Sequence, residues 1–573
     1  MNIRRMLCCL TLAAVQTINV FSAGRVLKID FSNPVQEYGS SAFDFASIFQ
    51  GGSQPMSLLS YVRAIDQAAV DNTVSMIFLS TDKLSAGISQ TEEIRAALQR
   101  FRDSGKEIIA YANDLSTLSL FLASVANTVV LNPTADPFIT GIATQQFYLK
   151  DILDTLGIDV QLIRHGKFKS AGEMYVRNSS SDENRLQNTE MVTSMWNSMA
   201  GEIARSRGIS MEQLNGWIDS LSLKGAESFK TLGLVDELWF KDQLDSCICS
   251  RMGVPSVSLV RFVKAKRYAD KLPKGKRANR IAVVYANGDI VMEDESGMGS
   301  GAAVVGASMA NTLAKVASDD KVKAVVFRVN SPGGSAQAAE LIRREVERLG
   351  AKKPVYVSFG EYAASGGYWI SAGGEKIFTD NTTLTGSIGV FSIVPSFGNA
   401  IRKNLKVNPE VLGSNAHSDM LAGMRPLSEQ EVGFFQDQVE RVYDQFTDIV
   451  ANGRGLAKSR VDEIGQGRVW TGADALGIGL ADFNGGLADA IAYAADKAGL
   501  AAGEYRICEY PEVRPASLFS MLSGDVEDPE ETLTSNVASN SGVFGQLIPQ
   551  AAYLRAITHP MLMTRMEGVI RIH

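Results

Sequence analysis

Residues Val325–Ser335 read VVFRVNSPGGS, a valine-rich apolar run that ends in a Pro-Gly-Gly turn. An apolar run of this kind is typical of a strand buried on both faces of a parallel sheet. The next residues, Ala336–Leu349 (AQAAELIRREVERL), have helical spacing, and Pro354–Phe359 (PVYVSF) reads as the following strand. Strands that alternate with helices predict an α/β fold in which a mostly parallel sheet is wrapped by helices.

The chain contains this pattern twice, at an offset of about 247 residues. Val74–Ser80 (VSMIFLS) matches Val322–Arg328 (VKAVVFR), and Leu232–Asp236 (LGLVD) matches Ile478–Asp482 (IGLAD). A steady offset over a long stretch indicates tandem copies of one fold. At 573 residues, the chain also exceeds what a single core usually supports.

The repeat and the composition between its copies suggest the domain organisation. We expect an N-terminal domain over residues 25–254, a basic linker over 255–280, a C-terminal domain over 281–500 and a partly mobile extension over 501–573. Residues 1–23 place Arg4 and Arg5 before a short apolar run, which indicates a signal peptide or a signal anchor. The run is shorter than the roughly 20 apolar residues that a spanning helix needs, so both readings stay open. In either case the bulk of the chain should be exported.

Composition argues against several classes of function. A net charge of −7 gives no reason to expect a nucleic-acid partner, and the basic cluster Arg261–Arg280 reads as a solvated linker or a membrane-facing rim. Five cysteines and four histidines occur without the spacing of a disulfide framework or a metal site. We therefore expect no metal and no other cofactor.

Two glycine-rich turns could carry chemistry. Ser365 lies in AASGGYW (Ala363–Trp369), directly after a strand, with small residues on both sides that leave its hydroxyl accessible. The carboxyl ends of adjacent parallel strands share one edge, so the SPGGS turn should lie beside Ser365. Backbone amides in such turns can stabilise a developing oxyanion. The plainer alternative is that both segments are structural turns and helix caps.

A serine nucleophile needs a base, and the first copy offers one. No histidine comes with an obvious carboxylate, but Lys169 lies in HGKFKSA (His165–Ala171), a stretch that the second copy lacks. Burial away from carboxylates would lower the pKa of a lysine from about 10.4 and keep the amine neutral, so Glu173 must point elsewhere. The first copy in turn places Thr117 opposite Ser365. One half then supplies the nucleophile and the other the base, unless Lys169 is an ordinary surface lysine.

In combination, four motifs resemble the signal peptide peptidase A family, peptidase family S49, in its long tandem-domain form. They are NSPGGS (330–335), AASGGYWIS (363–371), LTGSIG (384–389) and GKFKSA (166–171). The resemblance covers roughly residues 25–500. Because that family shares its core fold with Clp-type proteases and crotonases, the resemblance implies a tandem of two ClpP/crotonase-like domains.

The resemblance also implies roles for individual residues. It makes Ser365 the nucleophile and Lys169 the general base, with Ser387 orienting the lysine amine; the amides of Gly334 and Gly366 would form the oxyanion hole, with Gly333 as an alternative to Gly334. It implies a serine endopeptidase of the bacterial envelope that cleaves leftover signal peptides and similar apolar peptides. Such a protein would be a homotetramer at the surface of the cytoplasmic membrane, with its catalytic body on the periplasmic side.

Two other functions fit parts of the sequence. A crotonase-like acyl-CoA enzyme uses an oxyanion hole of similar construction, but it would need a catalytic carboxylate and would seldom be exported. An inactive membrane scaffold would not need all the motif residues that this chain retains. Labelling of Ser365 by a fluorophosphonate probe would separate the protease from both.

Overall fold

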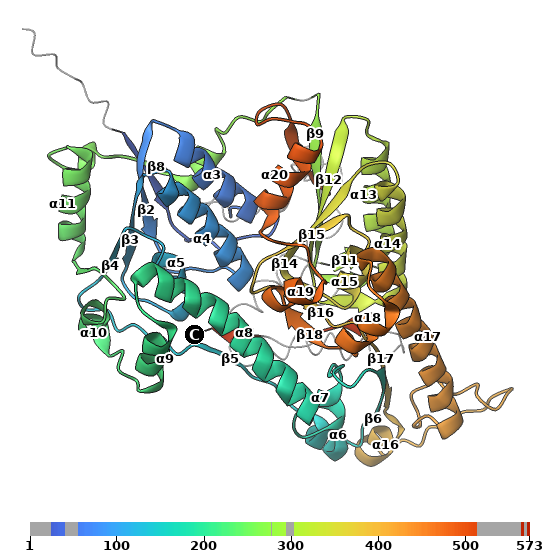
Figure 1. Cartoon of the computed structure of the whole chain (residues 1–573). Coiled ribbons are helices and arrows are strands. Elements are labelled where there is room, and N and C mark those ends of the chain that lie inside the picture. The colour runs from blue at the N-terminus through green and yellow to red at the C-terminus, as the bar shows by residue number, and fades with distance from the viewer. Residues whose placement is uncertain are drawn as a thin grey trace, which may run out of the picture.

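The computed structural model describes residues 24–39, 55–276, 278–293, 303–512, 563–566 and 570–572. The predicted leader over residues 1–23 and the acidic, polar stretch over 524–543 lie outside the described residues. Figure 1 shows two lobes side by side, the first coloured blue to green and the second yellow to orange.

The N-terminal lobe is built on a six-stranded sheet in the order β7-β4-β3-β2-β1-β8. All of its strand pairs are parallel. The lobe comprises β1 (Arg25–Ile29), α3 (Leu58–Val70), β2 (Val74–Ser80), α4 (Ile88–Asp103), β3 (Glu107–Ala112), α5 (Thr117–Ala123), β4 (Thr128–Leu131), β5 (Ile142–Thr144), α6 (Lys150–Leu156), β6 (Asp159–His165), α7 (Glu173–Val176), α8 (Asp182–Arg207), α9 (Met211–Asp219), α10 (Gly225–Thr231), β7 (Glu237–Leu238), α11 (Lys241–Met252), the 3-10 helix η1 (Val257–Leu259), β8 (Arg261–Lys264) and α12 (Ala265–Ala269).

The C-terminal lobe is built on a second sheet, in the order β18-β16-β14-β12-β9-β20, with β15 paired to β14 and β19 paired to β15. Its strand pairs are parallel except that of β16 with β18. The lobe comprises β9 (Arg280–Asn287), β10 (Asp289–Val291), β11 (Ala303–Val305), α13 (Gly306–Ser318), β12 (Val322–Ser331), β13 (Gly333–Ser335), α14 (Ala336–Gly350), β14 (Val355–Ala364), α15 (Gly366–Ser371), β15 (Lys376–Thr379), β16 (Leu384–Gly386), β17 (Val390–Ser396), α16 (Gly398–Ala400), the π-helix η2 (Ile401–Leu405), α17 (Glu429–Arg454), α18 (Lys458–Ile464), β18 (Val469–Thr471), α19 (Gly472–Ile478), β19 (Phe483–Asn484), α20 (Leu487–Lys497) and β20 (Arg506–Tyr510). Two short strands of the C-terminal segment follow, β21 (Met563–Arg565) and β22 (Ile570–Ile572).

Helices cover both faces of each sheet, which explains the continuous apolar runs. In β2, Ile77 and Leu79 pack into the core formed with α3 and α4, whereas Met76 and Phe78 pack on the opposite face against α11. In β12, Phe327 faces the core that includes α13 and α14 residues, and Val326 faces α20. A strand with two buried faces has no reason to alternate apolar and polar residues.

The predicted α/β tandem fold is confirmed. Strand β2 corresponds to β12, β3 to β14, and the 26-residue helix α8 to the 26-residue helix α17. Part of the stretch assigned to the linker is ordered, because β8 pairs with β1 at the edge of the first sheet. Strand β20, from the expected extension, pairs with β9 of the second sheet. The domain boundaries themselves remain a prediction.

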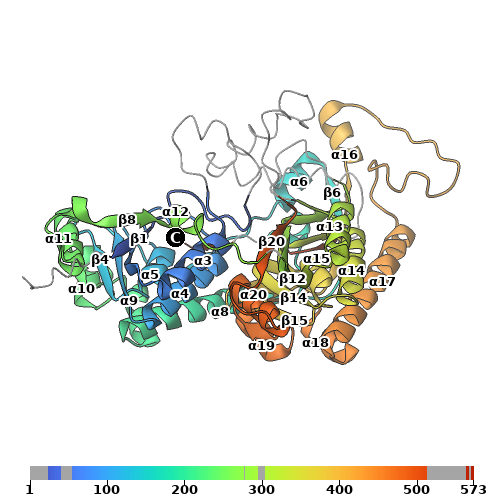
Figure 2. The ribbon, with the colours of Figure 1, turned by 90° about the horizontal axis from the view of Figure 1, so that it is seen from above.

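A third, mixed sheet joins the two lobes. Its order is β11-β10-β13-β21-β17-β6, so β6 of the first copy lies antiparallel to β17 of the second. Figures 1 and 2 show α8 running from the first lobe toward α7 and β6, beside the second lobe. Within the parts of the chain that the structure describes, no helix has the length and apolar character needed to cross a membrane.

Candidate active site

Ser365 lies between the end of β14 and the start of α15. It has φ 57° and ψ −115°, a backbone conformation that non-glycine residues seldom adopt and that costs about 1–3 kcal/mol. Its amide donates to the carbonyl of Gly386 at 2.8 Å, which fixes the turn. Its buried hydroxyl makes no capping bond to the helix that it precedes. The hydroxyl therefore does not cap α15.

The first copy uses a serine at the same place in a different way. Helix α5 begins directly after Ser116, just as α15 begins after Ser365, so Ser116 rather than Thr117 is the structural counterpart. Ser116 has φ −95°, and its hydroxyl accepts from the amide of Ser119. This serine is an ordinary N-cap.

The pairing of β6 with β17 brings Lys169 to Ser365. His165, at the end of β6, stands opposite Val390, at the start of β17. Lys169 follows β6 closely in sequence and Ser387 shortly precedes β17. The Nζ atom of Lys169 lies 2.8 Å from Ser365 Oγ, 2.9 Å from Ser387 Oγ and 3.1 Å from the Ser387 carbonyl oxygen. The Lys169 side chain is fully buried, so the surface-lysine alternative is wrong.

A loop of the second copy holds the lysine segment in place. The amide of Phe168 donates to the carbonyl of Gln466 at 2.9 Å. Gly467 has φ +79°, and a Cβ atom built on it would lie 2.5 Å from the Cβ of Lys169. Further back, the ring of His165 stacks on Tyr443 of α17 with centroids 3.7 Å apart. Sequence reasoning missed this loop, although the GQG triplet at 465–467 is a visible turn signal.

Glu173, the carboxylate nearest to the lysine segment in sequence, is engaged elsewhere, as expected. Arg164 donates to Glu173 Oε1 at 3.0 Å and to the Lys169 carbonyl at 2.6 Å. The Ser181 hydroxyl donates to the same carboxylate oxygen at 2.8 Å. This buried network fixes the backbone that carries the lysine.

The two glycine-rich turns lie side by side, as predicted, because Ser331 of β12 stands opposite Ala363 of β14. Gly334 has φ +153°, and a Cβ atom there would lie 2.0 Å from the Ile290 carbonyl oxygen, so only glycine fits. The amide of Gly333 donates to Ser331 Oγ at 3.2 Å. The amide of Gly333 is therefore engaged within the turn.

Gly366 is the first residue of α15. The first amides of a helix have no carbonyl partner within it and suit a developing negative charge.

Buried charges join the two copies behind the site. Arg328 of β12 is fully buried, bonds Glu93 of α4 at 2.7 Å and also pairs with Glu37. Its guanidinium donates to Ser358 Oγ at 2.9 Å. Breaking such a pair from one side is strongly destabilising, because it leaves an uncompensated buried charge. Sequence reasoning missed this cluster, although an arginine inside a valine-rich strand was its signal.

Glu361, four residues before Ser365 in sequence, accepts hydrogen bonds at the start of α4. Its carboxylate receives the amides of Ile88 at 3.1 Å and Gln90 at 3.0 Å. Desolvation by burial raises the pKa of Glu361 to about 7. Its contacts therefore attach the first copy directly to β14, the strand that precedes Ser365.

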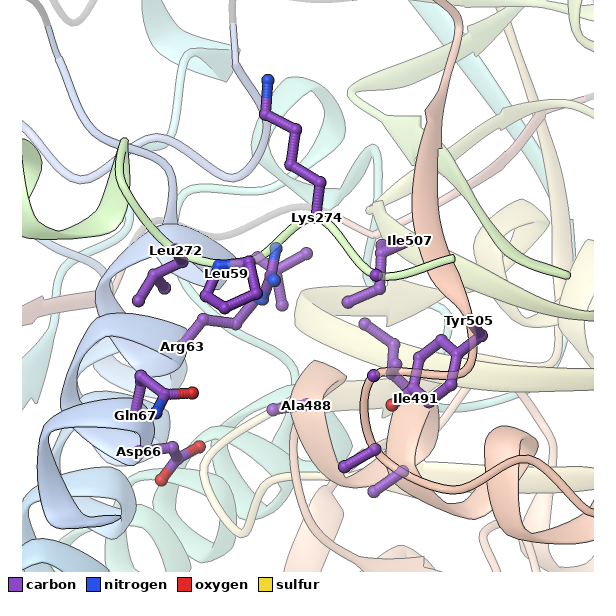
Figure 3. A pocket seen from close by; sticks show the side chains of 15 residues that line it. Leu59, Arg63, Asp66, Gln67, Leu272, Lys274, Ala488, Ile491, Tyr505 and Ile507 are labelled. Atoms are coloured by element: carbon purple, nitrogen blue, oxygen red, sulfur yellow. The ribbon is translucent and has the colours of Figure 1, made fainter. Parts of the chain in front are cut away.

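A separate cavity of about 480 Å³ lies between α3 of the first copy and α20 of the second (Figure 3). Its lining includes Arg63, Asp66, Lys274 and Tyr505. None of the predicted site residues lines it. We therefore do not assign it to the candidate active site.

Comparisons with known proteins assign the chain to a family. The model of peptidase family S49 matches residues 100–249, which contain Lys169, and residues 347–501, which contain Ser365 and Ser387. "Protease 4" of Haemophilus influenzae is 34% identical over 449 residues, covering 76% of this chain and 72% of the relative. "Serine protease SPPA, chloroplastic" of Arabidopsis thaliana is 30% identical over 484 residues, covering 83% and 70%.

A second "Protease 4", from Salmonella typhi, is 34% identical over 457 residues, covering 78% of this chain and 73% of the relative. Among solved structures, a ClpP1 variant from Listeria monocytogenes matches with 15% identity and a TM-score of 0.25, covering 36% of this chain and 94% of that chain. The three curated relatives are all named as proteases. The family model and these relatives show that the chain belongs to peptidase family S49 and is a serine protease.

Proposed function

We propose that the chain is an endopeptidase in which Ser365 is the nucleophile and Lys169 is the general base. The observation that carries this proposal is the distance of 2.8 Å between Lys169 Nζ and Ser365 Oγ. The two side chains come from different copies of the fold, and both are fully buried. A nucleophile and a base within hydrogen-bonding distance are the arrangement that covalent catalysis requires.

In the acylation step, the neutral amine of Lys169 takes the proton of the Ser365 hydroxyl while Oγ attacks the scissile carbonyl carbon. The carbonyl electron pair moves onto oxygen, and the amides of Gly334 and Gly366 stabilise that oxyanion. When the tetrahedral intermediate collapses, the C–N bond breaks. The leaving nitrogen takes the proton from the Lys169 ammonium and departs as an amine, which leaves an ester on Ser365.

In the deacylation step, Lys169 takes a proton from a water molecule that attacks the ester carbonyl. The second tetrahedral intermediate breaks the bond to Ser365 Oγ, and the lysine returns its proton to that oxygen. The enzyme is regenerated and the product leaves as a carboxylic acid. One base therefore serves both steps.

The mechanism requires Lys169 to be neutral before it acts. An ammonium cannot accept a proton, and burial disfavours the charged form of a lysine. Ser387 presents its hydroxyl and its carbonyl oxygen to Nζ, and the ring of Phe391 lies 5.8 Å away. Ser387 then acts as a positioning residue that aims the amine at Ser365.

We propose leftover signal peptides and similar apolar peptides as substrates. An apolar cluster that includes Ala171, Tyr175, Phe391 and Ile393 lies beside the lysine segment, which supports an apolar substrate. We further propose, from the family resemblance, a homotetramer at the periplasmic surface of the cytoplasmic membrane of a bacterial cell.

Labelling and digestion test the proposal directly. A fluorophosphonate probe should modify Ser365, identified by mass spectrometry of the labelled peptide. A synthetic signal peptide should be cut within its apolar segment. Ser365→Ala and Lys169→Ala should each lower kcat by at least about 10³-fold while leaving thermal unfolding intact.

Ser371→Ala is the matched control. Ser371 is a buried serine of α15, the short helix that follows Ser365, and its hydroxyl donates to the Gly367 carbonyl at 2.6 Å. It should retain turnover and probe labelling. Near-normal turnover by Lys169→Ala would contradict the proposed pair.

A further inference from the structure

The C-terminal segment of the chain completes the mixed sheet at the candidate active site. Strand β21 lies between β13, which contains the glycine turn, and β17, which begins shortly after Ser387. It is antiparallel to both neighbours. A segment more than 160 residues distant in sequence from either neighbour therefore lies between the two strands that flank the reacting groups.

The register places this segment directly on the oxyanion turn. Thr564 stands opposite Gly334, Arg565 opposite Gly333 and Met563 opposite Ser335. Beyond the strand, the amide of Met566 donates to the Pro332 carbonyl at 2.8 Å. The whole turn from Pro332 to Ser335 is paired with the C-terminal segment.

Side chains also hold the segment. Met563 packs against the apolar cluster that contains Phe391, and it stands opposite Phe391 in the register of β17. Arg565 lies 3.3 Å from the carboxylate of Asp289. Met566 is buried in the main core cluster of the first copy. The segment is thus anchored by apolar contacts at both ends and by an ion pair between them.

A second strand of the C-terminal segment, β22, pairs with the first lobe. β22 pairs antiparallel with β5 of the first copy, with Ile570 opposite Thr144. The segment is therefore held at two places, once in each lobe.

Without β21, the strands β13 and β17 would both have an unpaired edge, and an extended peptide would bind between them. Peptides add to sheet edges through main-chain hydrogen bonds, with alternate side chains entering pockets. Neighbouring strands are about 4.8 Å apart, so the slot between β13 and β17 holds one strand only. While β21 lies there, a substrate strand cannot pair with Gly334.

We propose that residues Met563–Met566 are an autoinhibitory strand, an internal ligand that occupies the place of the substrate peptide and competes with it for the slot between β13 and β17. This inference rests on the proposed function of Ser365 and Lys169. Because the strand is tethered, it competes at an effective concentration on the order of 1 mM. If the free segment binds with a Kd of about 0.1 mM, its tethered form lowers the apparent affinity for substrate about tenfold.

Thr564→Pro in the full chain is the test variant. Proline lacks the amide that a strand between two neighbours needs, and it is disfavoured at such a position. Thr564→Ser keeps the amide and is the matched control. A chain that ends at Leu562 is a second variant without the strand. We expect KM for an apolar peptide ester to fall about tenfold in Thr564→Pro and in the shortened chain, with kcat unchanged, and Thr564→Ser to behave like the unaltered chain.

Two further measurements separate this proposal from the one on which it rests. A synthetic peptide of residues 559–568 should inhibit the shortened chain competitively. The fluorophosphonate probe should label Ser365 faster in Thr564→Pro than in Thr564→Ser. Equal labelling and equal KM in all chains would overturn the autoinhibitory strand and leave the catalytic proposal standing.

Absence of labelling in every chain would reject both proposals. Cleavage of the C-terminal segment by the unaltered chain, but not by Ser365→Ala, would show a substrate rather than an inhibitor and would also overturn the inference.

Discussion

Replacing Gly467 with alanine should move Lys169 away from Ser365 while the fold stays intact. The new Cβ atom would lie 2.5 Å from the Lys169 backbone nitrogen and 2.5 Å from its Cβ. Carbon atoms in good contact are about 3.5 Å apart, so one of the two segments must move by about 1 Å. A displacement of that size between reacting groups costs about 10²-fold in rate. We therefore expect kcat to fall about 100-fold, with KM nearly unchanged.

Alanine at φ +79° is strained as well, which by itself lowers the free energy of unfolding by about 1–2 kcal/mol. Gly455→Ala controls for this effect. Gly455 ends α17 with φ +63°, and no atom lies within 4 Å of a Cβ built there. Gly467→Ala should unfold at a somewhat lower temperature than Gly455→Ala, because the contact with Lys169 adds to the strain, and only Gly467→Ala should lose kcat on a peptide ester. A kcat for Gly467→Ala within about twofold of that for Gly455→Ala would refute the reasoning.

Two other substitutions test neighbouring parts of the site. Ser387→Ala removes the hydroxyl that lies 2.9 Å from Lys169 Nζ but keeps the carbonyl oxygen at 3.1 Å. We expect kcat to fall about tenfold, the equivalent of one hydrogen bond of about 1.4 kcal/mol. An unchanged kcat and an unchanged pH–rate profile would contradict the positioning role of Ser387. Glu361→Gln tests the buried carboxyl whose pKa burial raises from 4.5 to about 7. Since the unfolded chain loses this proton first, the unaltered chain should lose stability relative to Glu361→Gln as pH rises from about 4.5 to 7. This loss of stability is at most about 3 kcal/mol, because Glu361 remains partly exposed to solvent. Urea unfolding measures it, and a difference in unfolding free energy between the two chains that is the same at both pH values would contradict the prediction.

The sequence contained enough information to predict the sheets and one half of the site. Valine-rich runs, the repeat offset and the glycine turns identified β12 and β14 as neighbours, and this placed the SPGGS turn beside Ser365. These signals are local, because they depend on the period of apolar residues and on the residues that a turn requires. The importance of Lys169 rested on a motif and on the absence of a better base.

The contact between the halves could not be predicted in the same way. Lys169 reaches Ser365 because β6 pairs with β17, and an antiparallel pairing between strands so far apart in the chain leaves no local pattern. Strand β21 is only three residues long and lies in a segment without repeat or motif. The partners of Arg328 could not be predicted either, since a charged residue in a buried strand implies a charged or polar partner but does not identify it.

The mixed sheet fixes the distance between two reacting groups that come from different copies of the fold. Strand β6 pairs with β17 over seven residues, so the lysine segment that follows it moves together with the lobe that carries Ser365. A hinge rotation of about 2°, acting over the roughly 30 Å of a small domain, shifts an atom by about 1 Å, and such a shift between the reacting groups would slow a proton transfer about 10²-fold. Because the lysine follows a strand that is paired with a strand of the second lobe, the first lobe can tilt without changing that distance.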